Sequence, residues 1–259
     1  MSTTESDTTT DSSTDSDDAW NAIIGAGVLD SHFEAAGAVV ELDEIVVRVD
    51  DSGIRTAAVG PDTASMVDAT LSVDEFDTFD VSGEVRFGVN IEDFRWVLGL
   101  ADGNAHVELA LDAETRKLHV SGDDFSYTYA PVDPDAMRSV PDFDTIGPDS
   151  DPSGFMIEAN DLVRAINGCD HVDDSIELLT TADGVELSSD GDLDDLTFDF
   201  GVNTLLDMDF DAGTESLYGT EYLKGYANAL DGEVRVDFWG EAPIRLRFSK
   251  HASSVDYWL

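Results

Sequence analysis

Carboxylates are the most abundant groups in this sequence that could do chemistry. The chain has 41 Asp and 16 Glu among 259 residues, so acids that lie close together in sequence arise by chance and predict little about catalysis. Two carboxylates could supply the general acid and general base of a metal-dependent hydrolase. We keep this acid-dyad hydrolase as the alternative from the enzyme class, although no further motif supports it.

Two acidic loops, residues 190–195 and 207–212, have the composition of calcium-binding loops. Such a loop needs a glycine at its sixth position for a sharp turn and a glutamate at its twelfth position as a bidentate ligand. Neither loop has either residue at those positions. We therefore expect both to be solvated loops that bind no metal.

The other reactive side chains do not form recognisable motifs. The five histidines are scattered without metal-ligand spacing: His32, His106, His119, His171 and His251. Cys169 is the single cysteine, so it cannot form an intramolecular disulfide, and we expect it to be a buried thiol. The pair Gly25 and Gly27 lacks the third glycine of a dinucleotide loop. The sequence predicts no catalytic residue, no metal site and no cofactor.

The charge balance points to an environment of high salt. Thirteen Lys and Arg against 57 Asp and Glu give a formal charge of −44, and molar salt screens the self-repulsion of such a chain. An acidic surface ordinarily argues against nucleic acid as a partner. Apolar residues make up 42% of the chain, which is enough for one or two cores. There is no long apolar run and no basic start before an apolar segment, so we expect a cytoplasmic protein without a membrane span.

Short runs of alternating apolar residues predict antiparallel hairpins in the first half of the chain. The expected strands are residues 44–49, 54–59, 65–71, 85–89, 106–111, 117–121 and 125–130. Residues 28–38 and 91–101 carry apolar side chains at helical spacing instead, so each should be a short helix that packs one face on a sheet.

The same order of elements returns after a proline-rich and aspartate-rich connector, residues 132–152. The expected strands are residues 155–158, 175–180, 184–188, 193–200, 233–239 and 244–248, with helices at 159–169 and 219–230. Residues 1–18 contain only Met1, Ser, Thr and acids, which predicts a disordered acidic tail. The sequence therefore predicts an α+β protein with two copies of one unit, domain 1 at 19–131 and domain 2 at 153–259.

Several segments in this duplicated frame resemble the sliding clamp family of archaea and eukaryotes, proliferating cell nuclear antigen (PCNA). They are residues 51–71, 75–79, 88–91, 114–118, 129–138 and 255–259, and their order matches the family across residues 20–259. The resemblance implies a homotrimeric ring, with antiparallel sheets outside and two short helices per domain lining a hole for duplex DNA. It implies a non-enzymatic processivity factor that is nucleoid-associated. Its implied partners are a clamp loader, DNA polymerase and other proteins with a clamp-binding peptide.

The resemblance also implies roles for particular residues. Arg95, Arg164 and Lys224 are the bases on three of the predicted lining helices and would face DNA phosphates without reading sequence. A shallow apolar pocket for the partner peptide would be formed by Val59, Ala64, Phe143, Ile146, Pro243, Tyr257 and Trp258. The subunit interface would pair two edge strands, with Phe125, Tyr127 and Tyr129 on one and Leu196, Phe198 and Phe200 on the other.

Three departures from the family pattern predict a divergent paralogue of haloarchaeal type. The first predicted helix has Asp30 and Glu34 but no base, and the connector ends with Gly147 and Pro148 where the family often has an aliphatic residue. The sequence ends at Leu259, where family chains continue into an Ala-Pro segment, so we expect a weakened peptide pocket. A regulatory or decoy clamp without replication activity is therefore the alternative within the same fold.

Overall fold

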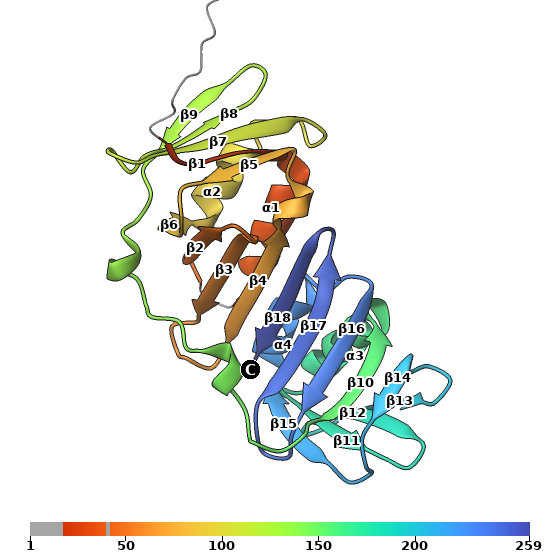
Figure 1. Cartoon of the computed structure of the whole chain (residues 1–259). Coiled ribbons are helices and arrows are strands. Elements are labelled where there is room, and N and C mark those ends of the chain that lie inside the picture. Colours follow the sequence, from red (N-terminus) through yellow and green to blue (C-terminus); the bar gives the residue numbers. More distant parts are fainter. Residues whose placement is uncertain (1–17, 40–41) are drawn as a thin grey trace, which may run out of the picture.

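The computed structural model describes residues 18–39 and 42–259, and it contains two units with the same order of elements (Figure 1). Each unit has a strand, a helix, five strands, a second helix and three strands. The α+β class and the duplication are confirmed. The predicted tail lies outside the described residues except for Asp18, which is the first residue of β1.

The first unit contributes a five-stranded antiparallel sheet. Its strand order is β5 (Thr78–Val81), β1 (Asp18–Gly25), β7 (His106–Asp112), β8 (Leu118–Ser121) and β9 (Ser126–Tyr129). The second unit contributes a four-stranded sheet in the order β13 (Asp195–Gly201), β12 (Gly184–Asp190), β11 (Ser175–Thr180) and β15 (Glu215–Gly219). β9 and β13 are each the last strand of their sheet, and they lie at opposite ends of the molecule (Figure 1).

A nine-stranded sheet joins the two units. Its order is β14 (Asp207–Asp209), β10 (Ser153–Glu158), β16 (Glu233–Phe238), β17 (Ile244–Lys250), β18 (Ser253–Trp258), β4 (Met66–Ser72), β3 (Gly53–Val59), β2 (Glu44–Asp50) and β6 (Val85–Asn90). The joint is the antiparallel pairing of β18 with β4. The last strand of the chain therefore holds the two units in one continuous sheet.

Four α-helices lie on one side of this sheet: α1 (Ala26–Ala36), α2 (Ile91–Leu98), α3 (Ala159–Val172) and α4 (Thr220–Ala227). α1 packs beside α2, and α3 packs beside α4. In the view of Figure 1, α3 and α4 lie behind the nine-stranded sheet, so its near face is the outer face of the molecule. None of the described helices is long and apolar enough to cross a membrane.

Local sequence explains how these elements form. The strands of the core alternate buried and half-buried residues, as in β2, where Ile45, Val47 and Val49 face inward. α2 begins after Asn90, whose side chain accepts a hydrogen bond from the Asp93 N–H at 3.0 Å. β1, β5, β14, β15 and β18 were not expected as strands. β5 and β14 are only four and three residues long, too short to show a clear alternation.

The connector contains two 3-10 turns, η2 (Pro134–Ala136) and η3 (Phe143–Thr145), and a third turn, η1 (Val73–Glu75), follows β4. Val132, at the start of the connector, forms an isolated β-bridge with Gly88 on β6. A Cβ on Gly88 would lie 3.0 Å from the Val132 carbonyl oxygen and closer still to the Met137 sulfur. Glycine therefore lets the connector run close to the edge of the sheet.

Candidate functional site

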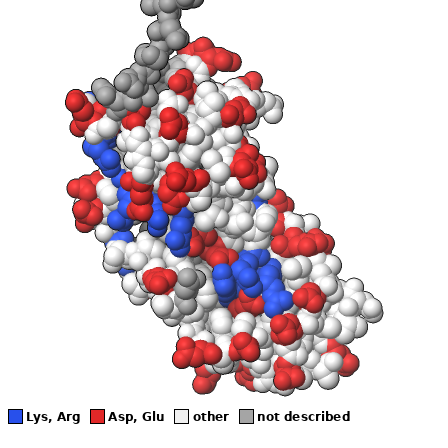
Figure 2. Space-filling view, viewed as in Figure 1, with Lys and Arg blue, Asp and Glu red and all other residues white. Residues whose placement is uncertain are grey.

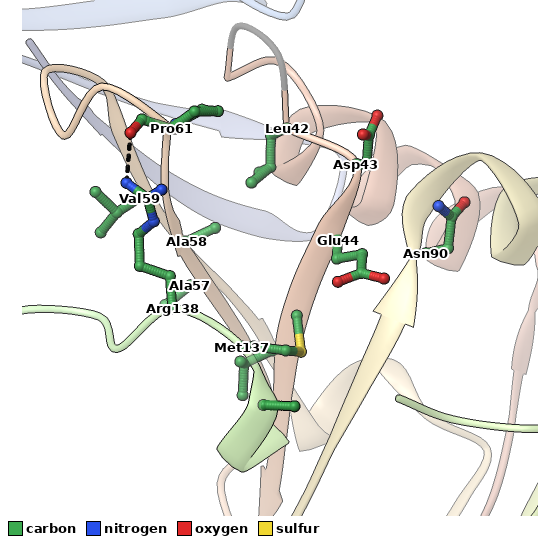
Figure 3. Close-up of a pocket in the computed structure, with 12 residues that line it drawn as sticks. Leu42, Asp43, Glu44, Ala57, Ala58, Val59, Pro61, Asn90, Met137 and Arg138 are labelled. Atoms are coloured by element: carbon green, nitrogen blue, oxygen red, sulfur yellow. Dashed lines mark hydrogen bonds between the residues drawn. The ribbon is translucent and has the colours of Figure 1, made fainter. Parts of the chain in front are cut away.

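The first surface of functional interest lies where the connector crosses β2 and β3 (Figure 3). Connector residues 136–138 and these two strands enclose a cavity of about 380 Å³. Its walls include Val46, Val59 and Met137, and Asp43 and Glu44 lie at one side. Arg138 closes the opposite side, because its Nη1 donates to the carbonyl oxygens of Gly60 at 3.0 Å and Pro61 at 2.6 Å.

Part of the predicted peptide pocket comes together beside this cavity. Cross-strand pairing aligns Val59 with Met66, and Met66 with Trp258. Trp239 stacks on Trp258 with ring centroids 6.3 Å apart. The Trp239 ring also lies against the connector, since a Cβ on Gly147 would be 3.3 Å from it. Met66 and Trp239 were missed by sequence reasoning, and strand alternation from Trp258 across β4 could have identified Met66.

Tyr257 does not belong to this surface, which corrects the expectation from the sequence. Its side chain is 0% exposed, and its hydroxyl donates to the Ala35 carbonyl oxygen at 2.7 Å. Successive strand residues point to opposite faces, so Trp258 faces outward while Tyr257 faces helix α1. Burial also raises the pKa of Tyr257 well above its ordinary value.

The other expected pocket residues are spread along the outer face. Phe143 is buried against the sheet, with the Arg55 guanidinium 6.0 Å from its ring centroid. Ile146 and Pro243 are half-buried, and Ala64 is exposed. Trp258 is buried under Trp239, and Arg245 stacks over it at 5.0 Å. Its indole N–H has no hydrogen-bond partner among the described residues.

The second surface is the helix side, where all three bases expected to face DNA form ion pairs within the chain. Arg95 makes a two-pronged contact with Asp30, with nitrogen to oxygen distances of 2.8 and 3.1 Å. Arg164 lies 3.1 Å from Asp161 on the same helix.

Lys224 on α4 lies 2.5 Å from Asp170 on α3, and this hydrogen bond holds the pKa of Asp170 below its usual value. Helices α1 to α4 also carry Glu34, Glu92, Asp93 and Glu221. Their side of the molecule therefore has more acids than bases.

The third surface comprises the two free strand edges. On β9, Tyr127 is 37% exposed and its ring lies edge-on to Trp96 of α2, which is 59% exposed. On β13, Leu196 and Phe198 are half-buried under α3, and the adjoining Leu193 is 93% exposed. Phe125 is half-buried. Trp96 was missed because helical positions were not included in the expected edges. Leu193 was the first residue of the expected edge strand 193–200 but was not named at the interface, and β13 begins after it, at Asp195.

Tyr129 and Phe200, also expected at the interface, are both buried within their own unit. The Tyr129 hydroxyl accepts a hydrogen bond from the Asn90 N–H at 2.9 Å, and the Tyr129 ring packs edge-on to Phe94. Phe200 stacks on Phe198. Their side chains already have partners inside the subunit, so only their backbone can contribute to an edge contact.

The remaining reactive groups are structural. Cys169 is buried, and desolvation raises the pKa of its thiol to about 11, which disfavours the nucleophilic thiolate. Within residues 18–39 and 42–259, no three His, Cys, Asp or Glu side chains converge as metal ligands. The loops at 190–195 and 207–212 belong to that range.

Comparisons with known proteins place this architecture in the clamp class. The fold matches PCNA from A. fulgidus, solved with the C-terminal region of FEN-1 bound, with a TM-score of 0.82, 21% identity, and coverage of 93% of this chain and 97% of that one. It also matches a chain of the PCNA2–PCNA3 complex from Sulfolobus tokodaii, with a TM-score of 0.77, 20% identity, and coverage of 92% and 98%.

Sequence comparison identifies the family, whereas the structural matches show the fold. The family model for the N-terminal domain of proliferating cell nuclear antigen matches residues 23–123. The DNA polymerase sliding clamp of Natronomonas pharaonis is 36% identical over 234 residues, which cover 88% of this chain and 92% of that protein. The chain belongs to the DNA polymerase sliding clamp family.

Proposed function

We propose that this chain is the subunit of a homotrimeric ring that closes around duplex DNA and tethers replication and repair proteins to it. The observation that carries the proposal is the position of the two free edges. β9 and β13 end their sheets at opposite ends of the molecule (Figure 1), and the four described helices share one side. Head-to-tail pairing of two different edges gives a ring when the rotation between neighbouring copies closes, and we infer a closed ring with the helix side inward.

The inner surface of this ring would hold DNA by linkage rather than by tight binding. Arg95, Arg164 and Lys224 are each offset by an aspartate, so few charges remain to attract phosphate. In molar salt the affinity from phosphate contacts falls further, by roughly 0.9 logarithmic units per neutralised phosphate for each decade of salt. A closed ring needs no such affinity to stay on a circular duplex.

Retention on DNA tests this proposal directly. The chain is loaded onto circular plasmid by the clamp loader of its own organism in molar KCl, and the DNA-bound fraction is separated by gel filtration. We expect retention on the circle, release when a restriction enzyme cuts the DNA, and no gel shift on short linear duplex. A decoy clamp predicts no retention on either form, and equal retention on cut and uncut DNA contradicts the ring.

The outer face beside the connector is our candidate for partner docking, as supported by the apolar row of Val59, Met66 and Trp258. We expect a peptide from the C-terminal region of FEN-1 to bind here, and the Met66→Asp variant to weaken it at least tenfold by calorimetry. Unchanged affinity would remove this row from the docking site.

In this proposal the chain has no catalytic step of its own, and it associates with the nucleoid through the DNA that it encircles. The acid-dyad hydrolase makes the opposite prediction, since it requires turnover. Incubation with phosphate esters and with DNA in the presence of Mg²⁺ or Mn²⁺ separates the two. Hydrolysis that disappears when a pair of acids is changed to amides would favour the enzyme.

A further inference from the structure

The basic residues of this acidic chain gather on the outer face of the nine-stranded sheet, not on the helix side. Figure 2 shows them in two groups, one toward the first unit and one toward the second. The strands that carry them are β2, β3 and β6 in the first unit and β16 and β17 in the second. With only 13 bases against 57 acids, clusters of bases are not expected by chance, so the contacts of each group of bases indicate its role.

The group on the second unit is neutralised by its neighbours. Arg235 and Arg247 both bind the buried carboxylate of Asp237, at 2.8 and 2.5 Å. Arg245 pairs with Asp256 on β18. These arginines therefore serve the sheet itself and offer little charge to a ligand.

The group on the first unit is different, because it places three arginines side by side. The strand register puts Arg86 directly opposite Arg48, and Arg48 directly opposite Arg55. Like charges opposite each other destabilise a sheet. Arg55 is offset by Asp68 at 2.7 Å, and Arg48 by Glu84 at 3.0 Å and Asp50 at 3.3 Å.

Arg86 has no such compensation. It is exposed, and its guanidinium makes no hydrogen bond or ion pair with any residue in the described parts of the chain. Its backbone carbonyl, by contrast, accepts a hydrogen bond from Arg116 at 2.7 Å. A cation that repels its neighbours and lacks a counter-charge is the feature expected of an anion-binding position.

Two cavities under the connector open onto this cation. One, of about 240 Å³, is lined by Arg86 together with Arg48, Arg55 and Phe143. The other, of about 280 Å³, is lined by Arg86 together with Arg138. The remaining walls are largely apolar: Val46, Ala57, Val140, Pro141 and Met137. The site thus combines several arginines with an apolar floor.

We propose that this arginine crevice, formed by Arg48, Arg55, Arg86 and Arg138 beneath the connector, binds a short partner segment that carries a carboxylate next to an apolar side chain. The carboxylate would accept a two-pronged contact from Arg86, and the apolar side chain would pack on Val46 and Phe143. Arginine is enriched at protein interfaces because its planar fork combines these two kinds of contact.

Nucleic acid fits this crevice less well. Glu84 and Asp135 lie in the walls of the same cavities, and they would repel a continuous run of phosphates. A single Asp or Glu side chain carries one negative charge, so these two acids repel it less than they repel a run of phosphates. The inference rests on the proposed function only for the identity of the partner proteins that carry the segment. The crevice itself lies within one subunit.

The test compares two labelled probe peptides that differ in one charged side chain: Gly-Ser-Asp-Leu-Ser-Phe-Gly and its amide counterpart Gly-Ser-Asn-Leu-Ser-Phe-Gly. Fluorescence anisotropy is measured on the full chain between 0.5 and 3 M KCl. We expect the acidic probe to bind at least tenfold more tightly, with a preference that shrinks as salt rises. Arg86→Gln should abolish the preference, and Arg86→Lys should retain part of it. Lys117→Gln removes one exposed charge elsewhere and should change nothing.

Three results would overturn the inference. The two probes could bind equally, Arg86→Gln could leave the preference intact, or the acidic probe could bind only after residues 2–17 are deleted. The last result would make the acidic N-terminal segment of the chain the occupant. Retention on circular DNA is measured on the same Arg86→Gln protein, and we expect it to be unchanged. Failure of the proposed function would appear as lost retention on circular DNA, and failure of the crevice inference would appear in the peptide anisotropy. The two failures are therefore distinguishable.

Discussion

His32 links three elements at the joint between the two units. It lies on α1 and is fully buried, and hydrogen bonds connect its Nδ1 to Ser253 Oγ at 2.9 Å and its Nε2 to Thr56 Oγ1 at 3.1 Å. Ser253 is on β18 and Thr56 is on β3, so the imidazole contacts both sides of the β18–β4 seam. Desolvation lowers the pKa of His32 from 6.5 to about 4.

This lowered pKa predicts an acid-sensitive stability. Below pH 6.5 His32 becomes protonated in the unfolded chain. In the folded chain it stays neutral until the pH falls to about 4. The free energy of unfolding therefore falls as the pH drops through this window, by about 2 kcal/mol at pH 5. Guanidinium unfolding of wild type and His32→Gln at pH 7 and pH 5 in constant KCl measures the effect. The variant should be less stable at pH 7 and should lose less on acidification, whereas His119→Gln, at an exposed position, should behave as wild type.

Single carboxylates on α3 are expected to set how long the ring stays on DNA. Asp161 and Asp170 offset Arg164 and Lys224, so the Asp161→Asn/Asp170→Asn variant leaves six bases per trimer without these partners. We expect retention on circular plasmid to lengthen severalfold, with a steeper dependence on salt. The Asp51→Asn/Asp80→Asn variant removes the same charge at two other exposed positions. If both variants lengthen retention equally, the effect comes from total charge and not from the helix side.

At the scale of elements, the free edges of β9 and β13 are the features that a partner copy would use. An exposed edge strand invites pairing with another chain. Both edges carry apolar side chains beside an adjoining helix, Tyr127 next to Trp96 and Phe198 under Arg164. The Arg164 guanidinium lies 5.7 Å from the Phe198 ring centroid, so a base expected to face DNA also covers part of this edge.

A charge placed on either edge should break the assembly. We expect Tyr127→Asp, and separately Leu193→Asp, to convert the trimer to a monomer in 2 M KCl, because each buries an unpaired carboxylate at the contact. Sedimentation equilibrium distinguishes a mass near 27.9 kDa from three times that value. Leu217→Asp alters an exposed apolar residue on β15 and should leave the trimer intact. Trimers in both edge variants would mean that the ring uses other surfaces.

The whole molecule carries a formal charge of −44, so a trimer gathers three such charges. Asp123 and Asp124 lie just before β9, and Asp194 and Asp195 lie at the start of β13. The screening length is about 3 Å in 1 M salt and about 10 Å in 0.1 M salt. We therefore expect a trimer in molar KCl that dissociates on dilution of the salt, as measured by light scattering. A monomer at every salt concentration would contradict the ring.

The sequence alone was sufficient for features that depend on near neighbours. Alternating apolar residues predicted most of the longer strands, helical spacing predicted all four helices within a few residues, and the repeated order predicted the two units. The acid-to-base ratio predicted a chain adapted to salt. Each of these follows from the period of a strand or a helix, or from composition, and needs no knowledge of what lies across the molecule.

Only the tertiary structure decided which side chains meet. The β18–β4 seam joins residues 182 to 192 positions apart, and that pairing turned Tyr257 inward and Trp258 outward. The bases on α2 and α4 found aspartates on neighbouring helices, which spacing along the chain does not reveal. The register of β6, β2 and β3 brought Arg86, Arg48 and Arg55 together from three separate segments. Charge pairing and pocket formation act through space, so the fold had to place these residues before their roles could be inferred.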